Sequence, residues 1–140
     1  MGESFVWRLS LRSSIDDVFA ALTTDEGRAR FWAEKTVESN GAIEFHFPNG
    51  LTHEAPIVEK AAPTRFAIRY FGANTAFALK EDSGETIVTV SVDDAPEDDW
   101  LDAYAGWISV LMNMKAVLDF GADLRNHDPH KSWDQRFIDN

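Results

Sequence analysis

The chain contains no cysteine among its 140 residues. Disulfide bonds, thiolate zinc sites and a cysteine nucleophile are therefore excluded. The first ten residues, MGESFVWRLS, contain no apolar segment of the kind found in secretory signals. No apolar run elsewhere approaches the length of a membrane span. We therefore expect a cytoplasmic protein that does not insert into a membrane.

Positive charge is also scarce. Lys and Arg number 13 against 24 Asp and Glu, which gives a formal net charge of −11. Nucleic acid phosphates attract clustered basic side chains, and an excess of acid repels them. We therefore expect no nucleic-acid partner, and the acidity otherwise indicates only good solubility.

The motifs of common catalytic and cofactor sites are missing as well. No nucleophile elbow, Ser/His/Asp spacing or phosphate-binding glycine loop occurs. The acidic run DDAPEDDW, residues 93–100, lacks the spacing of a calcium loop and suits the positive end of a helix. HDPH, residues 127–130, holds two metal-capable histidines, but its proline favours a surface turn. We predict no metal, no cofactor and no catalytic residues.

The patterns that are present indicate one globular domain of mixed secondary structure. A chain of this length with 44% hydrophobic residues can bury a sizeable core. Residues 5–11 alternate between apolar and polar side chains, which predicts a half-buried strand. Ser14 is a candidate N-cap for a short helix. A second short helix, capped by Thr24 or Asp25, is expected to run to Trp32.

Between residues 35 and 94 the hydrophobic period becomes two, and turns rich in Gly, Pro and Asn separate the apolar segments. Short connections favour antiparallel neighbours with one apolar face. The side chains predicted to share that face are Ile43, Phe45, Phe47, Leu51, His53, Ala55, Ile57, Phe66, Ile68, Tyr70, Thr75, Phe77, Leu79, Val88, Val90 and Val92.

The segment YAGWISVLMNMKAVLDF, residues 104–120, predicts a long helix. Its apolar arc covers roughly 200° of the circumference, more than one flat contact needs. Only Asp102, Ser109 and Asn113 form a polar strip. We therefore expect a curved sheet to surround this helix.

Four segments, in this order and spacing, resemble the START-like (SRPBCC, Bet v 1-like) superfamily. They are SSIDDVFAALTTDEGRARFWAE, HEAPIVEKAAPTRFAIRY, GETIVTVSV and GWISVLMNMKAVLDF. The last is similar to the Gly-Trp helix signature of the branch named after the activator of heat shock protein 90 ATPase. The resemblance covers residues 5–120. It departs from the usual pattern at Ala55, where the family has glycine, and at Asn40-Gly41, where it has a glycine pair.

The resemblance implies an α+β helix-grip fold. In this fold a curved antiparallel sheet wraps around a long C-terminal helix, and two short helices follow the first strand. We expect residues 1–120 to form a single helix-grip domain. Residues 121–140 would form a C-terminal tail with a short helix.

The resemblance also implies a cavity between sheet and helix, where helix-grip proteins bind lipids, sterols or polyketides. From the residues alone, the same side chains would equally form a solid core, because protein interiors leave few voids. Both interpretations stay open. The predicted ligand-binding residues are Phe45, Phe47, His53, Phe66, Tyr70, Phe77, Trp107, Leu111 and Met114.

His53 is the one side chain on the predicted apolar face whose ordinary pKa lies near neutral pH. A buried imidazole needs partners for its ring nitrogens, here a backbone carbonyl, Tyr70 or the polar end of a ligand. A shift of one residue in the strand register would turn His53 outward and bring Glu54 inward.

We predict a protein that binds a small hydrophobic ligand, lipid-like or polyketide-like. One alternative is a cyclase- or hydrolase-type enzyme using the same cavity, with His53, Tyr70 and Glu54 as a thin acid/base set. Another is a chaperone-associated activator of heat shock protein 90 ATPase. We expect no chaperone partner, because eukaryotic activators carry an additional N-terminal domain and this chain begins almost at its first strand.

A homodimer is a further alternative. Trp100, Ile108 and Met112 on the long helix exceed what one sheet can cover. In the tail, Trp133, Phe137 and Ile138 stand at helical spacing and need a surface to pack on. That surface belongs either to the same domain or to a second chain.

Overall fold

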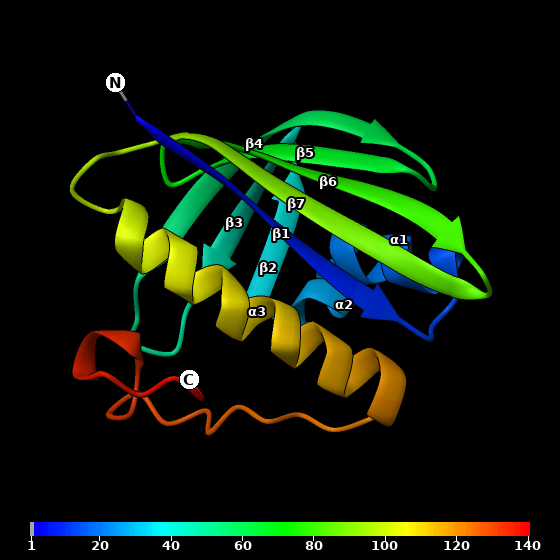
Figure 1. The fold of residues 1–140 in the computed structure, drawn as a ribbon. Coiled ribbons are helices and arrows are strands. Elements are labelled where there is room, and N and C mark those ends of the chain that lie inside the picture. The colour runs from blue at the N-terminus through cyan, green and yellow to red at the C-terminus, as the bar shows by residue number, and fades with distance from the viewer. Residues whose placement is uncertain (1) are drawn as a thin grey trace.

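The computed structural model describes residues 2–140 as one seven-stranded antiparallel sheet, two short helices and one long helix (Figure 1). The elements in chain order are β1 (Glu3–Leu11), α1 (Ile15–Thr23), α2 (Asp25–Ala29), β2 (Lys35–Ser39), β3 (Ala42–His46), β4 (Thr52–Ala61), β5 (Arg65–Tyr70), β6 (Ala73–Asp82), β7 (Glu85–Ala95), α3 (Trp100–Phe120) and a 3₁₀ turn, η1 (Trp133–Gln135). The strand order is β1-β7-β6-β5-β4-β3-β2. The predicted helix-grip arrangement is confirmed.

The two short helices begin at side-chain caps. Ser14 accepts a hydrogen bond from the Asp17 amide at 3.2 Å, and Thr24 accepts one from the Gly27 amide at 3.0 Å. Of the two candidate caps for α2, Thr24 is therefore the one used. Gly27 lies so close to α1 that a Cβ atom would be 2.5 Å from the Ala21 Cα, so only glycine fits there.

The second helix is shorter than predicted. α2 ends at Ala29, and the Arg28 carbonyl then accepts hydrogen bonds from the amides of residues 31, 32 and 33. This tight turn brings both Phe31 and Trp32 into the core, where their rings stack at 5.9 Å. A continuous helix would have rotated adjacent side chains about 100° apart and could not bury both equally.

The predicted alternation of the strands is confirmed, with one exception. Ile43, Phe45, Phe66, Ile68 and Phe77 are fully buried, and Val88, Val90 and Val92 continue this face on β7. Leu51, predicted to point inward, is half exposed. It precedes β4 in a tight loop closed by a hydrogen bond from the Phe47 amide to the Leu51 carbonyl, so the period of the strand does not reach it.

α3 crosses the face of the sheet on which the apolar side chains gather (Figure 1). Trp107, Leu111, Met114 and Val117 are buried against it. The sheet does not cover the whole apolar arc: Ile108 and Met112, two of the side chains expected to exceed what one sheet can cover, remain 44% and 50% exposed. The sheet curves around one side of the helix only, and the opposite side faces outward.

The contact between α3 and β1 is fixed by hydrogen bonds at both ends of the helix. Near its start, the Trp7 indole donates to the Tyr104 carbonyl at 3.1 Å. Near its end, Asp119 accepts hydrogen bonds from the backbone amides of Arg12 and Ser13. Burial alone would raise the pKa of Asp119, but these hydrogen bonds outweigh it and lower the pKa, so the carboxylate stays ionised.

The tail after α3 folds back along the helix toward the loop between β3 and β4 (Figure 1). Arg125 is buried and donates to the Ala33 carbonyl at 2.9 Å and to the Ala29 carbonyl at 2.8 Å. Farther along, Ser109 on α3 donates to the Ile138 carbonyl at 2.6 Å. The predicted short helix is reduced to η1, which ends where Arg136 adopts a φ of 71°. Phe137 and Ile138 stay exposed, so they do not pack as one apolar face.

Candidate ligand cavity

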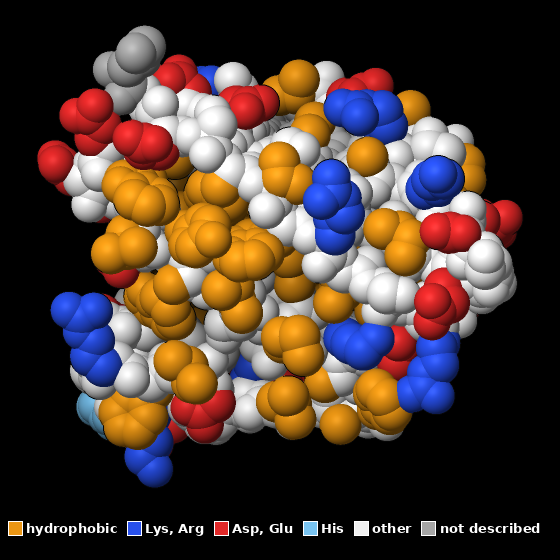
Figure 2. Space-filling view, in the orientation of Figure 1, with side chains coloured by type: hydrophobic (Ala, Val, Ile, Leu, Met, Phe, Trp, Pro, Cys, Tyr) orange, Lys and Arg blue, Asp and Glu red, His pale blue; other side chains and the backbone are white. Residues whose placement is uncertain are grey.

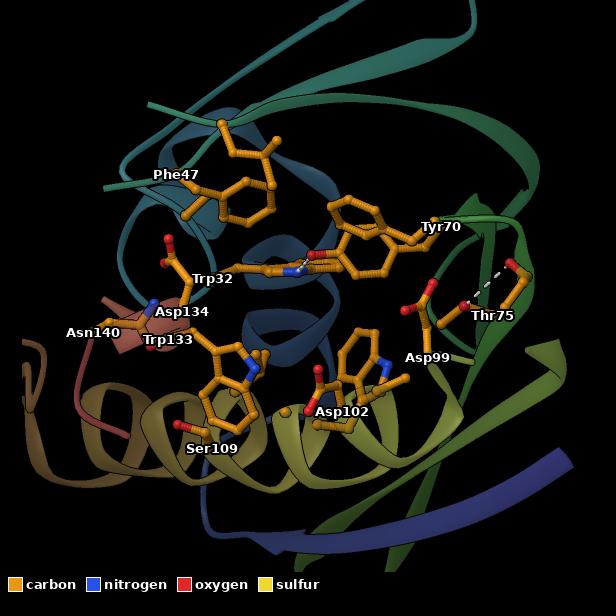
Figure 3. A pocket seen from close by; sticks show the side chains of 18 of the residues that line it. Trp32, Phe47, Tyr70, Thr75, Asp99, Asp102, Ser109, Trp133, Asp134 and Asn140 are labelled. Carbon is orange, nitrogen blue, oxygen red and sulfur yellow. Dashed lines mark hydrogen bonds between the residues drawn. The ribbon is translucent and has the colours of Figure 1, made fainter. Parts of the chain in front are cut away.

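A cavity of about 480 Å³, partly open to solvent, lies between α3, the sheet and the tail (Figure 3). Its wall takes residues from the turn after α2, the β3–β4 loop, the β5–β6 turn, the end of β7, one side of α3 and the tail. Ligand pockets typically measure about 300–1,000 Å³ and are mostly apolar with a few polar groups. In size and composition the space suits a small organic molecule.

Three aromatic rings form the inner wall of the cavity. Trp32 lies 5.5 Å from Tyr70 and 5.5 Å from Trp107, centroid to centroid, and Tyr70 lies 5.6 Å from Trp107. The Trp32 indole donates to the Tyr70 hydroxyl at 3.1 Å (Figure 3). The mutual edge-to-face packing fixes all three rings, because aromatic pairs favour such tilted arrangements.

Tyr70 adds a polar group to this apolar wall. Burial raises the pKa of its phenol well above the usual value, despite the hydrogen bond from Trp32, so the hydroxyl stays protonated. Among residues 2–140 the hydroxyl accepts from Trp32 and finds no acceptor for its own proton. It is therefore available as a hydrogen-bond donor to an occupant.

Gly106 leaves part of the cavity open on the α3 side. It lies in the middle of the helix and in the cavity wall, and a Cβ atom at this position would meet nothing within 4 Å. Its neighbour Trp107 is buried in the core. The helix therefore presents a gap to the cavity where any other residue would present a side chain.

The sequence-predicted site residues divide between cavity and core. Phe47, Tyr70 and Trp107 lie in the cavity wall. The other apolar residues of the prediction are buried in the core and do not reach the wall; they are Phe45, Phe66, Phe77, Leu111 and Met114. The solid-core and open-cavity interpretations thus apply to different parts of the same face. A role in ligand binding stays a prediction for every residue of the set.

His53 lies on the predicted face of β4 but outside the cavity wall. Its Nε2 accepts a hydrogen bond from the Phe71 amide at 2.9 Å, and its ring stacks on the Phe71 ring at 3.9 Å. Burial lowers the pKa of His53, partly offset by Glu54, and the neutral ring is the form that can accept this bond. The partner is a backbone amide rather than the carbonyl or hydroxyl that was expected. Glu54 is exposed, so the register shift does not occur.

His53 therefore supports the cavity indirectly. The bond holds Phe71, whose φ of 48° is rare for a bulky residue, at the β5–β6 turn. Phe71 and its neighbour Tyr70 both line the cavity. The imidazole thus fixes a part of the wall without touching the space inside.

Several residues of the cavity wall were not predicted from the sequence. Trp32 lies in one of the sequence segments that resemble the family, but it was not among the predicted site residues. Gly106 has no side chain, so hydrophobic periodicity gives no indication of its role. Trp133 and Arg125 come from the irregular tail. The aromatic pair Phe31-Trp32 was the one usable signal among them.

No metal site is found among residues 2–140. In the HDPH segment, His127 instead bridges two carboxylates: its Nε2 lies 2.6 Å from Asp123 and its Nδ1 2.7 Å from Glu34. The bond with Asp123, and secondarily Glu34, raises the pKa of His127. This bridge joins the tail to the segment before β2.

No helix of the described residues is long and apolar enough to cross a bilayer.

The family model for Activator of Hsp90 ATPase homolog 1-like protein matches residues 12–119. No curated protein matches the chain.

Solved structures of similar fold include the Aha1 dimer from Colwellia psychrerythraea, with a TM-score of 0.77, 20% identity and coverage of 85% of this chain and 98% of that one. DynU16, a protein of the dynemicin biosynthetic locus, has a TM-score of 0.74 and 16% identity, covering 86% of this chain and 49% of its own. A conserved protein of unknown function from Enterococcus faecalis has a TM-score of 0.72 and 21% identity, covering 98% and 80%.

The family match spans most of the chain, and these neighbours share the curved sheet and the long C-terminal helix. The chain belongs to the Activator of Hsp90 ATPase homolog 1-like family of the START-like superfamily.

Proposed function

We propose that the protein binds a small, mainly apolar molecule in the cavity between α3, the sheet and the tail. The observation that carries this proposal is a space of about 480 Å³ walled by aromatic rings. Protein interiors normally leave few voids larger than a water molecule. Although this space is partly open, it forfeits packing contacts between α3, the sheet and the tail, and a role in binding explains why it is kept.

Gly106 supports the same proposal. Glycine in the middle of a helix is less favourable than alanine by about 0.5–1 kcal/mol, and no close contact here forbids a larger residue. The position therefore carries a cost in stability that the fold does not require. The cost is explained if the space beside Gly106 is kept for an occupant.

Binding of N-phenyl-1-naphthylamine, an uncharged dye that brightens in apolar sites, tests the proposal. We expect saturable binding to the natural chain and a loss of at least about tenfold in affinity for Gly106→Leu, whose side chain enters the cavity. Met112→Leu is the matched control, because it changes the same helix on its exposed side. Absence of saturable binding, or equal affinity in both variants, would refute the proposal.

An enzymatic role for the predicted His53, Tyr70 and Glu54 set finds no support in the geometry. His53 is occupied by the Phe71 amide outside the cavity wall, and Glu54 is exposed on the other face. Tyr70 alone offers a donor but no base. Stimulation of heat shock protein 90 ATPase, the activity in the family's name, would be tested directly with the cognate chaperone. The cytoplasmic location stays a prediction.

We further propose that a second copy of the chain covers the outer side of α3. Hydrophobic side chains gather over this helix in Figure 2, and the exposed ones include Leu101, Ile108 and Met112. Large exposed apolar patches usually mark interaction sites. A relative of similar fold, from Colwellia psychrerythraea, was solved as a dimer.

Sedimentation equilibrium tests the dimer. We expect a dimer for the natural chain and a monomer for Ile108→Glu, because a buried carboxylate without a partner opposes association. Val58→Glu is the control, since Val58 is also apolar and exposed but lies on β4, away from α3. A monomeric natural chain, or dissociation by the control alone, would contradict this assignment.

A further inference from the structure

The cavity is elongated and follows α3. The helix contributes Asp99, Asp102, Gly106, Val110 and Asn113 to the wall, spaced three or four residues apart along one side. Asn113 lies fourteen positions after Asp99, which corresponds to about 20 Å at a rise of 1.5 Å per residue. The occupant that fits best is therefore long rather than round.

Two carboxylates stand toward one end of this cavity. Figure 3 shows Asp99 and Asp102 on the side of Thr75 and Tyr70, with Trp133, Asp134 and Asn140 on the opposite side. Unlike the first two carboxylates, that of Asp134 accepts hydrogen bonds from the side chains of Asn49 and Ser132. Asp99 and Asp102 have no cationic partner among the described residues. The positive end of α3 offsets only about half an elementary charge. Glu97 and Asp98 add further negative charge beside it.

The wall offers no free cation to balance these acids. Arg125 is the one Lys or Arg side chain in the described wall. Its guanidinium is already engaged by the carbonyls of Ala29 and Ala33 and by both carboxylate oxygens of Asp123. The Asp123 pKa is lowered by these bonds, which outweigh the effect of burial, so the ion pair persists. Arg125 therefore holds the tail and cannot anchor an anionic ligand.

Asn113 provides an independent sign that the cavity receives a polar guest. Asn113 is only 9% exposed, lies in the wall and makes no side-chain hydrogen bond within residues 2–140, so the polar atoms of its amide are left facing the open space of the cavity. A partner is supplied if an occupant places a hydroxyl or carbonyl group beside it.

Building on the proposed function, we infer that the cavity selects a long apolar molecule with an amine at the end near Asp99 and Asp102, and excludes carboxylates such as fatty acids. A protonated amine gains from the two carboxylates, whereas an anion is repelled by them and meets no free cation. A second polar group, uncharged, would lie near Asn113. The ligand class is an aliphatic or polycyclic amine carrying a remote hydroxyl or carbonyl group.

Displacement of N-phenyl-1-naphthylamine by compounds of equal chain length tests this selection. At pH 7, dodecylamine is expected to displace the dye at a concentration about tenfold lower than dodecanoate, with dodecanol between them. Equal displacement, or a preference for dodecanoate, would overturn the inference and leave the proposed function intact. If the dye itself does not bind, the proposed function fails instead.

Two pairs of variants locate the effect. Asp99→Asn with Asp102→Asn is expected to remove most of the preference for dodecylamine over dodecanoate and to leave dodecanol unchanged. Glu97→Gln with Asp98→Asn removes the same charge from adjacent positions outside the wall and is expected to keep most of the preference. An equal loss in both pairs would mean that the overall negative field, rather than the cavity, discriminates, and the inference would be wrong.

Discussion

Gly106 allows a quantitative test of whether the cavity is empty space. The change Gly106→Ala adds one methyl group on the cavity side of α3, where a Cβ atom would meet nothing within 4 Å. Because the residue is helical and its φ is not positive, the alanine side chain introduces no strain. Helix propensity alone then predicts a stability gain of about 0.5–1 kcal/mol.

Gly27→Ala is the matched comparison, because the same substitution is expected to lower stability at this position. There the added methyl group would lie 2.5 Å from the Ala21 Cα and 2.7 Å from two carbonyl oxygens of α1, all of them backbone atoms. Side chains can rotate away from such a contact, but backbone cannot, so α1 and α2 must separate. Overpacking of this kind costs about 1–3 kcal/mol.

Urea unfolding followed by tryptophan fluorescence measures both changes. For a domain of this size, the Gly106→Ala gain corresponds to an increase in Tm of roughly 1–4 °C. A Gly106→Ala variant less stable than the natural chain would refute the reasoning, since it would mean that the space beside the helix is filled in solution. Equal effects of the two substitutions would also refute it.

Two further predictions concern the tail and the histidines. Arg125→Ala is expected to destabilise the fold by about 3–5 kcal/mol and to expose residues 121–140 to limited proteolysis, because the buried Ala33 carbonyl and the partly buried Ala29 carbonyl lose their donor. Arg136→Ala, at an exposed position, should do neither. The two histidines should oppose each other in unfolding experiments across pH. Because the pKa of His127 is raised in the folded protein, its contribution to stability is complete below pH 6.5 and is lost as the pH rises through the folded pKa. Because the pKa of His53 is lowered, its contribution to stability is lost as the pH falls below 6.5. His127→Gln should therefore flatten the alkaline side of the profile and His53→Gln the acidic side; unchanged profiles would contradict the assigned contacts.

The inward face of the sheet could be predicted from sequence because its period is strict. Once Phe66 is buried, Ile68 must be buried too, and the observed register follows this rule. The rule fails at Leu51, where the chain leaves the ladder. Alternation gives the side on which a residue points but not what it meets there. Phe45 and Phe47 share a face, yet one is enclosed by neighbouring rings and the other borders open space.

The tail could not be placed by the same means. Its attachment depends on single polar contacts, such as Arg125 with two carbonyls and Asn49 with Asp134, and these follow no period. The helical spacing of Trp133, Phe137 and Ile138 was misleading, because the chain leaves the helical conformation at Arg136. Irregular segments held by side-chain-to-backbone bonds leave little trace in a sequence.

The placement of the indoles has a practical consequence. Of the five tryptophans, Trp32, Trp107 and Trp133 line the cavity, whereas Trp7 and Trp100 lie outside its wall. Entry of a guest would change the surroundings of three fluorophores at once and alter their emission, while the other two would keep a constant background. Intrinsic tryptophan fluorescence can therefore report whether the cavity is occupied, and unlabelled compounds can be screened by the emission spectrum alone.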